Sequence, residues 1–153
     1  MIQLKTFLIL LPLLLLQLCS EDNQTNDCED LNISITSLES EYDCLDTRYQ
    51  LNIDLVDNFE LITSQEEFVS IVSGDCQPMI DFTTYDLVVG KQQLTNGNET
   101  ISYDLILDCK TSNLELTITF IQNETDVAPN LAYHVLMPKL LETQTLTVDI
   151  IIN

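Results

Sequence analysis

Five segments of the sequence alternate apolar and polar side chains, and this pattern constrains the fold more than any other feature of the chain. The segments are YQLNIDL (49–55), ISYDLILDC (101–109), LELTITF (114–120), LAYHVLM (131–137) and LTVDIII (146–152). A period of two is typical of β-strands that bury one face and expose the other. We therefore expect residues 28–153 to form a single, mainly β domain, built as an antiparallel sheet or sandwich.

Turn residues indicate how these strands connect. Asn96-Gly97 separates the apolar segment 85–95 from the segment 98–107, and this dipeptide predicts a two-residue hairpin between them. The sequence KTSN (110–113) joins the next pair of strands, and QNETDVAPN (122–130) forms a longer polar loop.

One short α-helix is expected near residues 64–73. Ser64 followed by Glu67 is a capping box, Phe68 and Ile71 lie on one face, and Gly74 ends the segment. The helix is too short to form a layer of its own, so we expect it to pack across one end or face of the sheet.

The first 18 residues are typical of a secretory signal peptide. Lys5 precedes the apolar run 7–16, which is shorter than the about 20 apolar residues that span a bilayer. Cys19 follows, and the sequence SED after it resembles the surface-export signal of Bacteroidetes lipoproteins, although Leu18 is bulkier than the residue usual before a lipidated cysteine. We expect a lipid on Cys19 and an acidic tether over residues 19–27; the alternative is an ordinary signal peptide cut near Cys19.

The other four cysteines are expected to form two disulfides, as in small exported domains. They are Cys28, Cys44, Cys76 and Cys109. Four cysteines allow three connectivities. We expect Cys28–Cys44, which would staple the segment between them, and Cys76–Cys109, which would join the region after the helix to a strand.

The charge of the chain excludes one class of partner. All 25 acidic residues follow residue 18, where only four Lys and Arg remain, so this part of the chain has a formal charge of −21. Nucleic acids and anionic lipid headgroups are bound through Lys and Arg and are repelled by such a surface. Cations and basic proteins are favoured partners.

Signatures of catalysis are missing from the sequence. It contains no G-x-S-x-G, H-E-x-x-H or S-x-x-K motif and no C-x-x-C pair. The single histidine, His134, lies on the polar register of its strand, where a solvent-facing or loop-covered side chain is expected. We therefore predict no catalytic residue, no metal ligand and no cofactor.

Carboxylates leave two other possibilities open. Asp54 with Asp57, or Asp104 with Asp108, would have to meet on an exposed face to act as an acid–base pair. A calcium site would need several oxygens, for which the acidic regions 20–30 and 123–126 are the candidates.

Four Asn-x-Ser/Thr sequons provide a further alternative. They lie at Asn23, Asn32, Asn98 and Asn123 and would indicate a secreted glycoprotein if the protein were eukaryotic. The sequence LCSED around Cys19 favours a bacterial lipoprotein instead.

Part of the chain resembles a known family. The shared elements are the helix with Glu66-Glu67-Phe68, the segment Ile80-Asp81-Phe82, a strand with Val88-Val89-Gly90, and the late strand 133–139 with its Tyr-x-Val-x-x-Pro-Lys pattern. Over residues 60–152 this layout is similar to small exported lipoproteins related to the C-terminal domain of PrcB, a protease-complex subunit. The resemblance implies a compact β-rich domain that binds or stabilises a partner protein, and it supplies no catalytic residues.

The sequence thus predicts a non-catalytic lipoprotein of the outer membrane or cell surface, anchored through Cys19, that binds another envelope protein. Sheet edges are its expected contact surfaces. The alternatives are a secreted calcium- or glycan-binding module and a carboxylate-dependent hydrolase.

Overall fold

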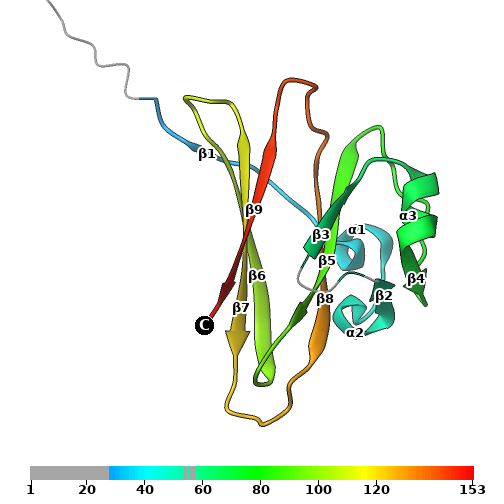
Figure 1. The fold of residues 1–153 in the computed structure, drawn as a ribbon. Helices are drawn as coiled ribbons and strands as arrows, with labels where there is room; N and C mark the ends of the chain where they lie inside the picture. The colour runs from blue at the N-terminus through cyan, green and yellow to red at the C-terminus, as the bar shows by residue number, and fades with distance from the viewer. Residues whose placement is uncertain (1–27, 54, 56–57) are drawn as a thin grey trace, which may run out of the picture.

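The computed structural model describes residues 28–53, 55 and 58–153, and within them the protein is mainly β, as predicted. Two sheets face each other, and three short helices with a two-stranded sheet cover the outer face of one of them (Figure 1). The elements are β1 (Leu31–Asn32), α1 (Leu38–Tyr42), α2 (Thr47–Gln50), β2 (Leu51–Ile53), β3 (Asn58–Ile62), α3 (Gln65–Ile71), β4 (Val72–Gly74), β5 (Tyr85–Gln93), β6 (Asn98–Leu107), β7 (Leu114–Gln122), β8 (Asn130–Pro138) and β9 (Leu146–Ile152).

The first sheet has the strand order β1-β6-β7-β9, and the second sheet has the order β3-β5-β8. All neighbouring strands are antiparallel except β7 and β9, which run parallel from Leu114↔Leu146 to Phe120↔Ile152. The expected hairpin around residues 110–113 joins β6 to β7. A parallel pair needs a crossover, and here the chain leaves β7, forms β8 in the second sheet and returns as β9.

The hairpin expected at Asn96-Gly97 is wrong, because β5 and β6 belong to different sheets. The turn is bound to the β7–β8 loop instead of closing on its own strands. Gln122 Oε1 accepts the backbone N–H groups of Thr95 and Asn96, and the Gly97 N–H donates to the carbonyl of Thr125 at 3.0 Å. The dipeptide therefore carries the chain from the second sheet to the first.

The core between the two sheets follows the predicted alternation. Its fully buried side chains include Leu105, Leu116, Ile118 and Phe120 from the first sheet, which face Tyr133 and its neighbours from the second. The rings of Phe120 and Tyr133 meet edge to face, with their centroids 6.0 Å apart. Aromatic pairs of this geometry add to the free energy gained by burying apolar area.

Strand β8 differs from the prediction because both of its faces are buried. Every residue from 131 to 137 is shielded from solvent. One face meets the first sheet, and the other is covered by α1, α2 and the β2–β4 pair, which form a second apolar cluster with β5 (Figure 1). His134 lies on this second face, where helices α1 and α2 bury it, rather than facing solvent or lying under a loop as expected.

Helix α3 is confirmed, with bounds two residues inside the expected end. Ser64 Oγ accepts the Glu67 N–H at 3.3 Å, and Glu67 Oε2 in turn accepts the Thr63 N–H at 2.9 Å. Phe68 is fully buried in the cluster beneath the helix. Residues 72–74 are not helical, because they pair with β2 as strand β4.

Helices α1 and α2 were not predicted. The segment YQLNIDL was expected to be one strand, but Tyr49 lies in α2 with an exposed side chain, and only residues 51–53 form β2. Ser37 caps α1 by accepting the Ser40 N–H at 3.2 Å, and Leu38 is its single fully buried residue. Helices of four and five residues show too little periodicity to be recognised by pattern.

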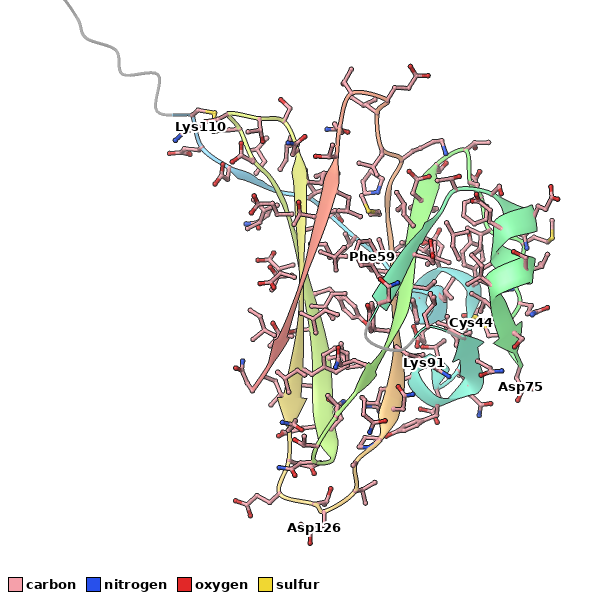
Figure 2. All side chains as sticks on the ribbon, viewed as in Figure 1. Cys44, Phe59, Asp75, Lys91, Lys110 and Asp126 are labelled. Carbon is pink, nitrogen blue, oxygen red and sulfur yellow. A yellow bond between two sulfur atoms is a disulfide. The ribbon has the colours of Figure 1, made fainter. Side chains whose placement is uncertain are left out.

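The described residues contain two disulfides, but the expected pairing is wrong. The bonds join Cys28 to Cys109 and Cys44 to Cys76, with a Cα–Cα distance of 5.6 Å in each. Pairing of β1 with the end of β6 brings Cys28 beside Cys109. Cys44 follows α1 on the opposite side of the sandwich, within the cluster that also holds Cys76 (Figure 2).

Candidate functional site

A cleft of about 540 Å³ lies where β6 approaches β8 and α2. Its walls are formed by residues of β6 (99–101 and Tyr103), of β8 (Ala132 and His134) and of the helical region (Ser37, Glu39 and 46–48). The cleft is a candidate site, because polar side chains of the four elements α1, α2, β6 and β8 converge there.

Three polar side chains contact one another on the floor of this cleft. Thr47 Oγ1 lies 2.6 Å from His134 Nε2 and donates to Glu39 Oε1, while Glu39 Oε2 lies 3.2 Å from the same Nε2. Thr47 and His134 are 2% and 4% exposed. Since the Thr47 hydrogen goes to Glu39, Nε2 must donate in both of its contacts.

The carboxyl group of Glu39 is held in its charged form. Partial burial raises the pKa of Glu39, but hydrogen bonds from His134 and Thr47 lower it by a larger amount. The resulting pKa lies well below the ordinary value. Burial raises the pKa of Tyr103, whose hydroxyl accepts the backbone N–H of His134 at 3.3 Å. Tyr103 is therefore a neutral hydrogen-bonding group beside the charged Glu39.

This cluster does not have the order of a nucleophilic relay. Such a relay places the nucleophile on one imidazole nitrogen and the carboxylate on the other. Here both Thr47 and Glu39 contact Nε2, and Nδ1 is buried with no hydrogen-bond partner among the described residues. The arrangement fastens α1 and α2 onto β8 rather than activating the threonine hydroxyl.

Of the two carboxylate pairs left open by the sequence, only Asp104 with Asp108 lies in the described part of the chain. Asp54 and Asp57 lie outside the described residues. Asp104 and Asp108 are four positions apart along the chain, about 13 Å on an extended strand. Asp108 Oδ1 accepts the N–H groups of Lys110 and Thr111, and these bonds, that of Thr111 foremost, lower its pKa.

In the candidate calcium regions, side-chain oxygens of Asn123 and Asp30 accept hydrogen bonds from nearby protein groups. Asn123 Oδ1 accepts the N–H and the hydroxyl of Thr125, and Asp30 Oδ1 accepts the Cys109 N–H at 3.1 Å. In the described part of the chain, no group of three or more His, Cys, Asp or Glu side chains is arranged to hold a metal ion. Residues 20–27 lie outside that part.

The outer edge of β9 is the second candidate site. Leu114 N–H donates to the Thr145 carbonyl and Asn153 N–H donates to the Phe120 carbonyl, both at 2.9 Å. These bonds fix the phase of the parallel ladder, in which alternate residues of a strand face each neighbour. The odd-numbered residues of β9 therefore direct their backbone groups to β7.

The even-numbered residues of β9 direct their N–H and C=O groups away from the sheet. They are Leu146, Val148, Ile150 and Ile152, and these backbone groups have no partner among the described residues. Free edges are usually blocked by Lys, Pro or a bulge. The sequence LTVDIII has none of these, and Ile151 and Ile152 are 38% and 43% exposed.

The outer face of the first sheet beside this edge is acidic. The register places Asp104, Thr117 and Asp149 in one row across β6, β7 and β9. Glu115 and Thr147 lie in the row next to it. The cations of the described chain lie elsewhere, in α2, in β5, in the β6–β7 turn and directly after β8.

Sequence reasoning named sheet edges but not the particular edge, since which strand lies outermost depends on the topology. It missed the cleft because Glu39 and Thr47 lie in unpredicted helices far from His134 in the chain. Cys19 lies outside the described residues, and none of the described helices has both the length and the apolar character to cross a membrane.

Comparisons with protein-family models, with curated proteins and with solved structures found no match.

Proposed function

We propose that this protein is a non-catalytic binding module that recognises a partner envelope protein by adding a strand of that partner to the free edge of β9. One observation carries the proposal: a seven-residue strand with alternate backbone groups unpaired on an unblocked edge. An extended segment can satisfy those groups with its own main chain, as in β-strand addition.

The rest of the β9 surface supports this function. Val148 and Ile150 pack partly against the core between the sheets, so apolar side chains of an added strand would extend that core. The edge is already formed, because β9 is paired along its whole length with β7. A preformed edge lowers the entropic cost of ordering a binding surface.

The proposed location is the outer membrane or cell surface, with the domain anchored by a lipid on Cys19. The two disulfides are typical of exported proteins. The described chain begins at Cys28, tied to Cys109, so a tether from Cys19 would enter the sandwich at the β6–β7 end, where Lys110 lies (Figure 2). The resemblance to PrcB-related lipoproteins points to the same role.

The test compares Val148→Pro with Val148→Ala. Both substitutions remove the branched valine side chain, but only proline removes the outward N–H and places a ring across the edge. Envelope proteins of the native host are captured on each variant and on the wild type.

We expect the alanine variant to retain the captured partner and the proline variant to lose it, with unchanged circular dichroism. Equal capture by all three proteins would contradict the proposal. If Val148→Pro does not fold, Ile152→Pro replaces it, because Ile152 also points its N–H outward and lies at the strand end.

A further inference from the structure

We infer that the strand captured by β9 is basic: it carries Lys or Arg on its outward face, alternating with apolar residues on its inward face. This inference rests on the proposed function and adds the chemical class of the partner. It follows from the charges around the edge and from the direction in which each β9 side chain points.

The acidic outer face of the first sheet favours cationic side chains on the outward face of the added strand. A strand added at about 4.8 Å from β9 continues the rows of the first sheet. One of its outward side chains then lies beside Asp149, in the row that already contains Asp104. Glu115 lies in the adjacent row, and no Lys or Arg belongs to β6, β7 or β9. An outward carboxylate there would meet like charge, and an outward cation would meet opposite charge.

The inward-facing side chains of β9 favour apolar residues on the inward face of the added strand. Val148 and Ile150 are half-buried against the core cluster, and Ile152 is 43% exposed. The inward side chains of the added strand would cover these residues, on the side of the sandwich where Phe59 of β3 also packs partly against the core (Figure 2). Alternation with a period of two then gives the partner sequence its pattern.

A second copy of this chain is a poor occupant. Its β9 carries the same acidic face, so pairing two edges would bring two Asp149 rows together. The formal charge of −20 on each whole chain adds long-range repulsion. A basic segment of another protein meets the same field as attraction, which raises its rate of association.

Ion pairs and main-chain hydrogen bonds contribute differently to the affinity for the added strand. Exposed ion pairs contribute little each, so exchanging an attractive contact at Asp149 for a repulsive one changes the dissociation constant about threefold to tenfold at moderate salt. The main-chain hydrogen bonds of the edge are independent of charge. Charge therefore selects among partners, whereas the edge supplies the binding itself.

The test uses two peptides as long as β9, one alternating Val and Lys and the other alternating Val and Glu. Each is titrated into the isotope-labelled whole protein, and amide shifts are followed by NMR. We expect the Val–Lys peptide to shift residues of β9 and β7 and to bind about threefold to tenfold more tightly than the Val–Glu peptide.

A pair of double variants controls for total charge. Asp104→Asn with Asp149→Asn removes the charges of the row, and Glu124→Gln with Asp126→Asn removes two exposed charges in the β7–β8 loop (Figure 2). We expect only the first double variant to bring the two peptides to similar affinity. An equal effect of both would show attraction to total charge and would overturn the inference.

The remaining outcomes distinguish the inference from the proposed function. If both peptides bind at β9 with equal affinity, the basic partner is wrong and strand addition stands. If neither peptide binds at β9 while Val148→Pro still abolishes capture of a host protein, the inference fails alone. If the peptides do not bind at β9 and capture is insensitive to Val148→Pro, both fail.

Discussion

Glu39→Gln tests the contact that holds α1 and α2 on β8, and its effect should depend on pH. The glutamate accepts from Thr47 and His134. Hydrogen bonds to a charged group contribute about 1.5–3 kcal/mol each when buried. Glu39 is 38% exposed, and Thr47 and His134 still bond each other after the substitution, so we expect a loss of about 1–2 kcal/mol in the free energy of unfolding at neutral pH.

The sign of the pH dependence follows from the lowered pKa. A carboxyl group whose pKa is lower in the folded protein stabilises it above the unfolded value and loses that effect as pH falls through the folded value. The ordinary pKa of Glu39 is 4.5. At 1.36 kcal/mol per pKa unit, a difference of about 1–2 kcal/mol should shrink over about one to two pH units below that value.

The assay is urea unfolding followed by circular dichroism, since the chain has no tryptophan. Wild type and Glu39→Gln are compared between about pH 6 and about pH 2.5. The control is Glu66→Gln, which removes an exposed acid from the first turn of another helix, α3. A difference that stays constant down to the lowest pH, or that Glu66→Gln reproduces, would refute the reasoning.

Two further predictions concern the fold. Gly90→Ala should lower the free energy of unfolding by more than about 2 kcal/mol, because a Cβ would overlap the Tyr133 hydroxyl and lie 2.5 Å from the carbonyl oxygen of residue 58; thermal melting checks this. Peptide mapping without reductant should recover Cys28 linked to Cys109 and Cys44 linked to Cys76. In the chain-entropy model each link stabilises by about 4 kcal/mol, so reduction should lower the melting temperature sharply, and any other linkage would contradict the topology.

The sequence predicts the parts of the fold that local patterns determine. Alternation identifies β6, β7, β8 and β9, and the Ser64–Glu67 box identifies α3 to within two residues. Local sequence patterns cannot assign strands to sheets. A turn such as Asn96-Gly97 can close a hairpin or connect two sheets, depending on which groups bind its backbone. Here the side chain of Gln122 accepts the backbone N–H groups of Thr95 and Asn96, and the turn connects the two sheets.

The same limit applies to the candidate sites and to the disulfides. The cysteines were identified correctly as disulfide-forming, but their pairing depends on β1 joining β6, which no local pattern reveals. His134 appears solvent-facing from its strand alone and is buried because helices distant in sequence cover it. Gly90 also shows a requirement that the local pattern does not reveal, because the Tyr133 side chain occupies the space that a Cβ would need.

The most direct test of the account is residue-by-residue amide exchange along β9, measured with and without the Val–Lys peptide. In the free protein, the amides of Thr147, Asp149 and Ile151 should exchange slowly because they bond to β7, and those of Val148, Ile150 and Ile152 should exchange fast. The peptide should slow the second set to the rate of the first. Even-numbered amides that are already slow in the free protein, or that stay fast with the peptide bound, would contradict strand addition at this edge.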